Sequence, residues 1–270
     1  MNRLPETSVV ALDRHGPFLF ATLDDPDTRN ALGVAMVADL EAVLAATRED
    51  RSLRALVLRG TEGRFCAGAN LKGNIAGGGQ SGAAGDPVLD ESRRGGRMYA
   101  ALNSHPMAVI ALIDGPAMGG GMGLACCADI VITTDRARFA LSETKLGLVP
   151  AQIARFVIAR IGLAKARRLS LSGARFDGAE AAKLGLSDFH CGSLAEAEER
   201  LAQLLDDIRH CAPEANARTK RFLQECARLS PDELIEEAAQ LFVTCLRGPE
   251  GIEGVAAFSE KRKAGWAEQA

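Results

Sequence analysis

The pattern of apolar and polar positions predicts a strand-rich first part of the chain, up to about residue 150. Apolar runs at Val9–Leu12 and Phe18–Leu23, separated by a turn-forming RHGP segment, predict an antiparallel hairpin. Val34–Glu49 carries apolar residues at helical spacing. Further apolar runs predict buried strands at Leu53–Arg59, Met107–Ile113 and Ile130–Thr133, and helices at Asp86–Ser104 and Leu124–Cys127. The low-complexity segment Gly77–Gly85 predicts a loop.

From Pro150 onward the pattern is almost wholly helical. The predicted helices are divided by Gly, Pro and Ser, and they cover Ala151–Ile161, Ala164–Leu171, Gly178–Leu184, Ser193–Cys211, Pro213–Leu229 and Pro231–Leu246. The last of these helices have mixed apolar and charged faces. Such faces pack either on the chain's own core or on other subunits, and the pattern leaves both possibilities open.

The composition is that of an ordinary globular protein. A chain of 270 residues, 47% hydrophobic and 25% charged, fits one large domain or a core with a helical appendage. The net charge of -3 gives no bulk attraction to nucleic acid or to an anionic membrane, so neither is expected as a partner. No apolar run approaches membrane-spanning length, and the first residues lack the apolar stretch of a signal peptide.

Cysteine and histidine positions argue against a metal site and against a disulfide framework. The seven cysteines are odd in number and form no CxxC pair, and the four histidines form no HExxH motif. Reduced thiols in a cytoplasmic protein are the simplest interpretation. We expect neither a metal nor a cofactor.

Two glycine-rich segments, Phe65–Leu71 and Gly115–Gly123, are the strongest candidates for chemistry. The GGGMG run fails the GxGxxG pattern of dinucleotide-binding turns, and no P-loop motif is present. A glycine-rich turn that enters a helix can instead present free backbone N–H groups. If the two segments converge on one carbonyl oxygen, they form an oxyanion hole. The alternative is that each glycine only permits a tight turn or close packing.

Five motifs in order along the chain resemble the crotonase (enoyl-CoA hydratase/isomerase) superfamily. They are RNAL, FCAGANL, DGPAMGGG, FALSETKLGLVP and EGIEGVAAFSEKR. The resemblance covers most of the chain and is weak at 73–101 and in the helices after residue 185. It implies an α/β fold, a crotonase-like ββα superhelix over residues 1–190, with a C-terminal helical trimerisation region over residues 191–270. The implied assembly is a homotrimer or a dimer of trimers.

The resemblance also implies an acyl-CoA substrate, which is not a cofactor, and a set of catalytic groups. The backbone N–H groups of Ala69 and Gly120 would hold the thioester oxygen, and Glu143 would move the proton. Relatives with two catalytic glutamates carry the first of them where this chain has Gly123. If the resemblance misleads, Glu143 is a helix-start or salt-bridge residue.

A single glutamate is compatible with a hydratase or with a Δ3,Δ2-enoyl-CoA isomerase. The GGGMGLACCAD segment and Pro150-Ala151-Gln152-Ile153 resemble the 3-methylglutaconyl-CoA hydratases and the related isohexenylglutaconyl-CoA hydratases. This favours a hydratase that acts on a branched glutaconyl-CoA in acyclic terpene or leucine-type catabolism. Two other classes are weaker: a non-catalytic scaffold or RNA-binding protein, and a hydrolase with Cys66 or Ser142 as nucleophile.

Binding residues follow from the same resemblance. Residues expected to contact the CoA are Arg29, Ala31, Ala67, Leu71, Lys72, Gly119 and Lys261. Glutaconyl thioesters carry a distal carboxylate, which an arginine could bind in bidentate geometry. The candidates for this contact are Arg93, Arg94 and Arg97, and the alternative is that these charges are a solvated helix face.

Overall fold

The computed structural model describes residues 3–70 and 86–268. Leu71, Lys72 and the loop expected at 77–85 lie outside the described residues. No helix in the described part combines the length and the apolar character needed to cross a membrane.

The main sheet has six strands in the order β1-β2-β3-β4-β6-β9. Its strands are β1 (Val10–His15), β2 (Phe18–Leu23), β3 (Ala55–Gly60), β4 (Ala108–Ile113), β6 (Ile130–Thr134) and β9 (Phe189–Cys191). The predicted hairpin is confirmed, because β1 and β2 pair antiparallel with Val10 opposite Leu23. The other pairs in this sheet are parallel. The expectation of an α/β fold is therefore confirmed.

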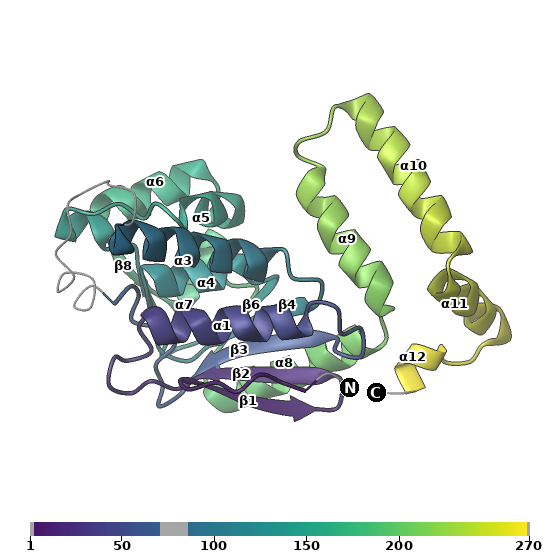
Figure 1. The fold of residues 1–270 in the computed structure, drawn as a ribbon, viewed down its shortest axis with the longest axis horizontal. Coiled ribbons are helices and arrows are strands. Elements are labelled where there is room, and N and C mark those ends of the chain that lie inside the picture. The colour runs from purple at the N-terminus through teal and green to yellow at the C-terminus, as the bar shows by residue number, and fades with distance from the viewer. Residues whose placement is uncertain (1–2, 71–85, 269–270) are drawn as a thin grey trace.

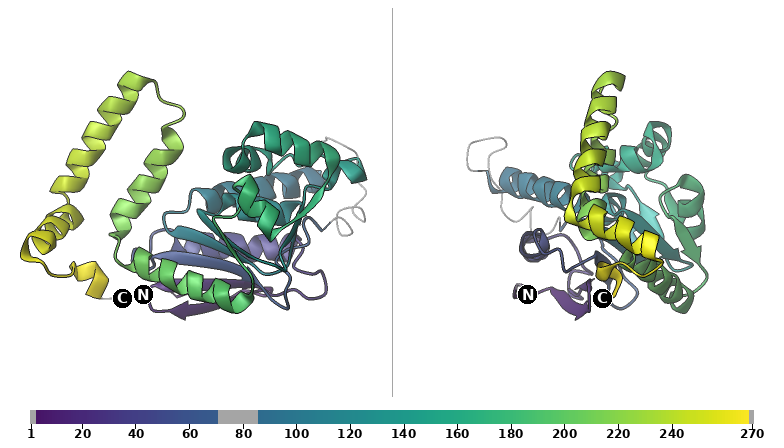
Figure 2. Two further views of the ribbon diagram at one scale, coloured as in Figure 1. Left: turned by 180° about the vertical axis from the view of Figure 1, so that it is seen from behind. Right: turned by 90° about the vertical axis from the view of Figure 1, so that its right-hand side faces the viewer.

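Helices cover both faces of this sheet, as Figure 1 and Figure 2 show. One face packs on α1 (Val34–Thr47), α3 (Pro87–Asn103) and α4 (Gly120–Cys127), and the other on α8 (Leu194–Arg209). Neighbouring residues of β3 show the alternation: Leu56 and Leu58 join the larger core, whereas Val57 packs with Leu201 and Ile208 of α8. Strands buried on both faces explain the uninterrupted apolar runs in the sequence.

A second, three-stranded sheet carries the segments that matter for the candidate site. It consists of β5 (Pro116–Met118), β7 (Arg138–Ala140) and β8 (Arg175–Asp177). The chain continues from β7 through η1 (Glu143–Leu146), α5 (Ala154–Ile161), α6 (Leu163–Ser172) and α7 (Gly178–Leu184). The expectation of an almost wholly helical chain after residue 150 is wrong at β8 and β9, because strands of three residues are too short to show an alternating pattern.

Helix α4 begins at Gly120, four residues earlier than the predicted start at Leu124. Glycine disfavours a helix interior, so the GGGMG run was interpreted as a turn. Packing outweighs this propensity, because a Cβ at Gly121 would lie 2.6 Å from the carbonyl oxygen of Cys66. The glycines allow the first turn of the helix to approach the segment at Cys66 closely.

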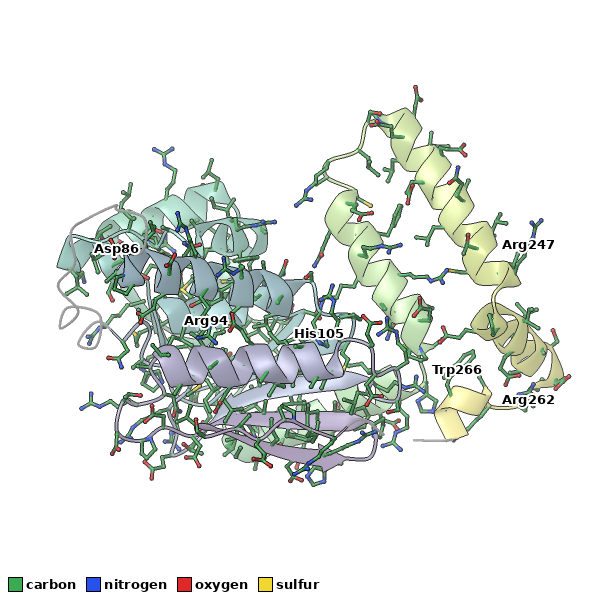
Figure 3. The ribbon with its side chains drawn as sticks, viewed as in Figure 1. Asp86, Arg94, His105, Arg247, Arg262 and Trp266 are labelled. Carbon is green, nitrogen blue, oxygen red and sulfur yellow. The ribbon has the colours of Figure 1, made fainter. Side chains whose placement is uncertain are left out.

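The last helices form an arm that projects from the core (Figures 1 and 2). They are α9 (Pro213–Glu225), α10 (Pro231–Arg247), α11 (Pro249–Glu260) and α12 (Gly265–Glu268). Helix α8, the first helix after residue 191, packs on the sheet, and the arm starts at Pro213. The chain returns to the core at Trp266, whose indole Nε1 donates to the carbonyl oxygen of His210 at 3.0 Å (Figure 3).

Candidate active site

The two glycine-rich segments lie side by side. Met118 N–H donates to the carbonyl oxygen of Cys66 at 2.9 Å, and Cys66 and Ala117 form a parallel bridge. On the other side, Leu32 N–H donates to the carbonyl oxygen of Gly68 at 2.7 Å. The segment that carries Ala69 is therefore held between the RNAL segment and the start of α4.

The backbone N–H groups of Ala69 and Gly120 lie close together. A Cβ at Gly120 would lie 3.7 Å from the Ala69 nitrogen, and a Cβ at Gly68 would lie 3.6 Å from the Gly120 nitrogen. Within 3–70 and 86–268, neither N–H donates a hydrogen bond to the protein. Gly120 is also the first residue of α4, where the helix dipole favours negative charge. Two unpaired donors at one point have the geometry of an oxyanion hole.

Glu143 reaches this place from β7. The strand pairs with β5, and Gly119 N–H donates to the carbonyl oxygen of Ala140 at 2.8 Å. A Cβ at Gly119 would lie only 2.9 Å from Oε1 of Glu143, and Gly119 has a φ of 48°. Both facts require glycine at position 119 and bring the carboxylate next to the first turn of α4.

The carboxylate of Glu143 is partly desolvated. Its Oε2 is buried and has no hydrogen-bond partner among the described residues. Burial raises the pKa of Glu143 above its ordinary value of 4.5, against a smaller opposing effect of its own backbone N–H. An unpaired buried carboxylate oxygen is costly unless a substrate or water uses it. Glu143 therefore has the environment of a general base.

The position that lacks a second glutamate is occupied by other side chains. A Cβ at Gly123 would lie 2.2 Å from Cγ2 of Ile153 and 3.2 Å from Cε1 of Tyr99. Both residues are buried. Ile153 belongs to the PAQI motif, whereas Tyr99, the chain's only tyrosine, lies in no motif that the sequence shows.

Asn30 is a second residue that the sequence analysis missed. Its side chain is buried, with Oδ1 accepting from Asp25 N–H at 2.7 Å and Nδ2 donating to the carbonyl oxygen of Arg64 at 3.2 Å. It ties the loop of Arg29 to the segment before Ala67, and Ala67 N–H donates to the carbonyl oxygen of Arg29 at 3.2 Å. The RNAL motif is the signal that could have identified this role.

The expected CoA contacts fall into two groups. Arg29 and Ala67 are exposed and Ala31 is buried beside them, next to Ala69, and Gly119 adjoins Glu143. Lys261 instead ends α11 on the arm, far from α4 and α5 in Figure 1. One chain does not bring Lys261 to this site.

The candidate contacts for a distal carboxylate are not gathered at the site. Arg93 pairs with Asp90, and Arg94 pairs with Glu41 of α1 at 2.6 Å (Figure 3). The face of α3 that approaches the site carries Tyr99, while Arg97 is exposed and has no hydrogen bond or ion pair among the described residues. The structure leaves their role as a prediction.

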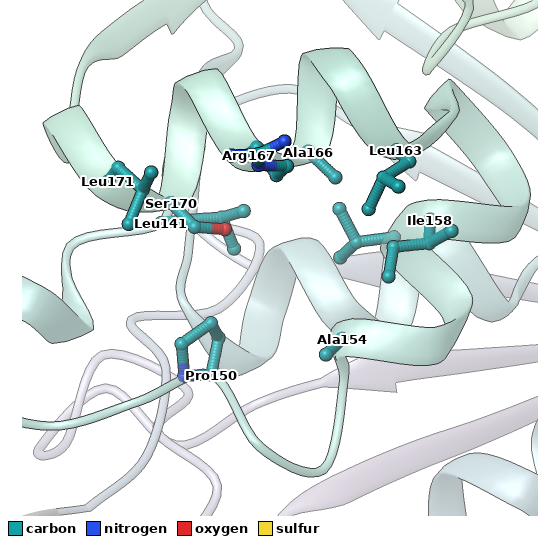
Figure 4. Close-up of a pocket in the computed structure, with 10 residues that line it drawn as sticks. Leu141, Pro150, Ala154, Ile158, Leu163, Ala166, Arg167, Ser170 and Leu171 are labelled. Atoms are coloured by element: carbon teal, nitrogen blue, oxygen red, sulfur yellow. The ribbon is translucent and has the colours of Figure 1, made fainter.

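An apolar pocket of about 380 Å³ lies between α5 and α6 (Figure 4). Leu141 and Pro150 line it from the segment that carries Glu143, and Arg167 and Ser170 are its polar members. None of its lining residues belongs to the turns of Ala69 and Gly120, so it is separate from the oxyanion-hole geometry.

Other chemistries lack support in the described residues. Burial raises the pKa of the Cys66 thiol to about 12, which disfavours a thiolate nucleophile. No group of three or more His, Cys, Asp or Glu side chains in the described part could hold a metal ion.

Comparison with known proteins places these features in a family. The enoyl-CoA hydratase/isomerase family model matches residues 17–269. A putative enoyl-CoA hydratase/isomerase of Bacillus subtilis, YngF, is 32% identical over 248 residues, which are 90% of this chain and 92% of that protein. Mouse enoyl-CoA hydratase domain-containing protein 2, a mitochondrial protein, is 32% identical over 268 residues, which are 96% of this chain and 88% of that protein.

Solved structures agree with this comparison. A Marinobacter aquaeolei enoyl-CoA hydratase/isomerase superposes with a TM-score of 0.92 at 42% identity, over 96% of this chain and 99% of that one. Pseudomonas aeruginosa AtuE gives 0.91 at 44% identity, over 96% and 100%. The chain has the crotonase fold, and it is an enzyme of the enoyl-CoA hydratase/isomerase family.

Proposed function

We propose that this enzyme adds water to the double bond of a branched glutaconyl-CoA thioester, 3-methylglutaconyl-CoA or isohexenylglutaconyl-CoA, in leucine-type or acyclic terpene catabolism. The observation that carries the proposal is the buried Oε2 of Glu143 beside the N–H groups of Ala69 and Gly120, all three without a hydrogen-bond partner among the described residues. A base and an oxyanion hole at one place are what addition to a thioester-conjugated double bond needs.

One carboxylate suffices for the proposed reaction. Glu143 takes a proton from water as the water oxygen bonds to C3, and the electrons of the double bond move onto the thioester oxygen. Ala69 and Gly120 stabilise that oxyanion with preorganised donors, each worth ~3 kcal/mol. The protonated Glu143 then returns its proton to C2 as the enolate collapses. The net change is the addition of one water, and no cofactor takes part.

The surroundings of Gly123 support a one-carboxylate mechanism. Ile153 and Tyr99 fill the volume that a longer side chain at position 123 would need. A second acid at this position would require both side chains to move. The departure from two-glutamate relatives therefore extends beyond one residue to the packing around it.

The apolar surroundings also favour the alternative activity, a Δ3,Δ2-enoyl-CoA isomerase. Isomerisation needs one base to move a proton along the acyl chain and needs no bound water. Ile153 and Tyr99 leave few polar groups to hold a water molecule near Gly123. We place this activity second, because the PAQI segment resembles the glutaconyl-CoA hydratases.

A substrate screen separates the two activities. Purified protein is assayed with crotonyl-, 3-enoyl-, 3-methylglutaconyl- and isohexenylglutaconyl-CoA, and we expect hydration of a glutaconyl thioester. Glu143→Gln should abolish it, and Glu199→Gln, on the exposed surface of α8, should not. If both glutaconyl thioesters remain unchanged and the double bond of 3-enoyl-CoA moves, the enzyme is a Δ3,Δ2-enoyl-CoA isomerase. Activity that survives Glu143→Gln would remove Glu143 from the mechanism.

The contact for the distal carboxylate needs its own variants. Arg97 and Arg167 are exposed arginines without an ion pair among the described residues, and Arg167 lines the apolar pocket. Arg93 and Arg94 are paired. Each is replaced by Ala, and the arginine that binds the carboxylate should raise KM for a glutaconyl thioester but not for crotonyl-CoA. Unchanged KM in all four would exclude this role for them.

The proposed assembly is a homotrimer or a dimer of trimers. The arm exposes large apolar side chains that include Leu223, Ile235, Phe242, Ile252 and Phe258. Apolar surface on a projecting element is typical of a contact between subunits.

The proposed location is the cytoplasm, and all seven cysteines, which lie in the described part, are free thiols.

A further inference from the structure

Tyr99 connects three helices next to the oxyanion-hole geometry. It lies on α3 with only 5% of its surface exposed. Its hydroxyl donates to the carbonyl oxygen of Gly120 at 2.9 Å, on α4. Cε1 of its ring lies 3.2 Å from the position that a Cβ at Gly123 would occupy. The ring centroid lies 6.3 Å from that of Phe156 on α5.

The hydroxyl of Tyr99 and the Ala69 nitrogen both lie beside Gly120. The point where a Cβ of Gly120 would lie is 2.6 Å from the Tyr99 hydroxyl and 3.7 Å from the Ala69 nitrogen. The first turn of α4 contains Gly120, Gly121 and Gly123, and close contacts of its backbone, such as that of Gly121 with the carbonyl oxygen of Cys66, place it against the core. The Tyr99 hydroxyl adds a contact at Gly120 itself, where a donor must be held within tenths of an ångström.

Ile153 and the tyrosine ring border the same space beside Gly123. Its Cγ2 and the ring's Cε1 approach the same point beside Gly123, at 2.2 and 3.2 Å from a Cβ placed there. The absence of a side chain at position 123 is what allows Tyr99 to cross this space and reach Gly120. Gly123, Ile153 and Tyr99 thus form one packing unit.

We propose that Tyr99 is a positioning residue, whose hydroxyl holds the Gly120 N–H in register with the Ala69 N–H and whose ring is fixed by Ile153. The inference rests on the proposed oxyanion hole. Tyr99 does not carry the proton in this role: it acts through Gly120.

Tyr99→Phe tests the hydroxyl alone. Acetoacetyl-CoA is the probe, because its enolate absorbs in the near ultraviolet and reports oxyanion stabilisation without turnover. We expect wild-type protein to bind the enolate. In Tyr99→Phe, the amount of bound enolate and the kcat for the best thioester of the screen should each fall about tenfold, with KM unchanged. This loss is smaller than the ~10²–10³-fold that removal of an oxyanion-hole donor itself costs. Ile153→Ala, which keeps the tyrosine hydroxyl but removes the Cγ2 beside the ring, should give a smaller loss.

Thr47→Val is the matched control, since it removes a buried, hydrogen-bonded hydroxyl from α1, away from the site. The role of Tyr99 would be overturned if Tyr99→Phe kept its bound enolate and its kcat, or if it changed KM alone. An equal loss of activity in Thr47→Val would also overturn it. Wild-type protein that binds the probe without enolate formation would overturn the oxyanion hole, and this inference with it.

A second measurement needs no variant. Tyr99 is the only tyrosine of the chain, so ¹³Cζ-tyrosine labelling gives one resonance that reports this hydroxyl. Its shift should change when acetoacetyl-CoA binds and stay constant with CoA alone, because only the thioester reaches the Gly120 donor. An unchanged resonance under saturating acetoacetyl-CoA would overturn the proposal, even if Tyr99→Phe failed to fold.

Discussion

At the scale of single residues, Glu143 links the protonation of one carboxyl group to activity. Burial raises its pKa above 4.5, and the base must be ionised to accept a proton. We expect kcat/KM to rise with pH through a midpoint above 4.5. Glu199→Gln should keep this profile. A rise centred at or below 4.5 would show that Glu143 is not desolvated in the working enzyme.

The same shift predicts how stability depends on pH. The folded state holds the proton of Glu143 more tightly than the unfolded chain, so its contribution favours folding below pH 4.5 and is lost as the pH rises through the raised pKa. Glu143→Gln should therefore be more stable than wild type at pH 7, and the difference should disappear in acid. Urea unfolding at both pH values measures this, and a difference independent of pH would contradict it.

Gly123 and Gly95 are helical glycines with opposite surroundings. A Cβ at Gly123 meets Ile153 and Tyr99, whereas one at Gly95 in α3 meets no atom of residues 3–70 and 86–268 within 4 Å. We expect Gly123→Ala to lower the free energy of unfolding by about 1–3 kcal/mol through overpacking. Gly95→Ala should raise it by about 0.5–1 kcal/mol, because alanine favours a helix.

Combining Gly123→Ala with Ile153→Ala, which removes the Cγ2 that a Cβ at position 123 would meet, tests the cause of that loss. If Ile153 causes the clash, the double variant should be more stable than the sum of the single changes predicts, which is measured as the coupling energy of a double-mutant cycle. Additive losses would mean that the strain lies elsewhere.

At the scale of elements, propensity and packing decide what the sequence could predict. The hairpin of β1 and β2 has strong local signals on both strands and in its turn, and it was predicted correctly. The start of α4 was not, because the contact of Gly121 with Cys66 is made between segments more than fifty residues apart. The strands β8 and β9 depend on pairing with β7 and β6, which no local pattern reveals.

The residues of the candidate site also differ in whether the sequence could predict them. Motif order gave the segments that carry Ala69, Gly120 and Glu143, and the structure places these segments together. The contributions of Tyr99 and Asn30 depend on tertiary contacts with Gly120 and Arg64, and these residues carry no local signature.

A half-buried ion pair is one of the contacts that fix helix α9 to the core. Lys220 Nζ lies 2.7 Å from Oδ2 of Asp129, which also accepts from Val109 N–H at 2.7 Å. Lys220→Met leaves the Asp129 carboxylate without its cation, and we expect a loss of about 1–3 kcal/mol in the free energy of unfolding at pH 7. Hydrogen exchange in α9 should also increase.

The loss should shrink as the pH falls, because a protonated Asp129 no longer needs a cation, and burial already raises its pKa. Arg221→Met on the same helix is the control, since Arg221 is exposed and unpaired among the described residues. Equal losses in both variants would show that the ion pair does not hold the helix.

At the scale of the whole molecule, Lys261 follows α11 on the projecting arm, and Figure 1 shows α11 far from α4 and α5. Exposed apolar residues along the arm, such as Phe242 and Phe258, favour its docking on another copy. If Lys261 contacts CoA as the family resemblance implies, it must then do so at the site of that copy. The arm would complete a neighbour's site as well as hold the subunits together.

Subunit mixing tests this arrangement. Glu143→Gln and Lys261→Ala are each expected to be weakly active alone, the first through lost kcat and the second through raised KM. When the two variants are unfolded together and refolded, they should form mixed assemblies. Some sites in these assemblies combine an intact Glu143 with an intact Lys261 from another copy. The activity at low CoA thioester concentration should therefore exceed the mean activity of the separate variants. Adding Phe258→Asp to both chains should lower the assembled mass in light scattering and remove the gain. Activity equal to the mean in full-size assemblies would mean that Lys261 serves no neighbouring site.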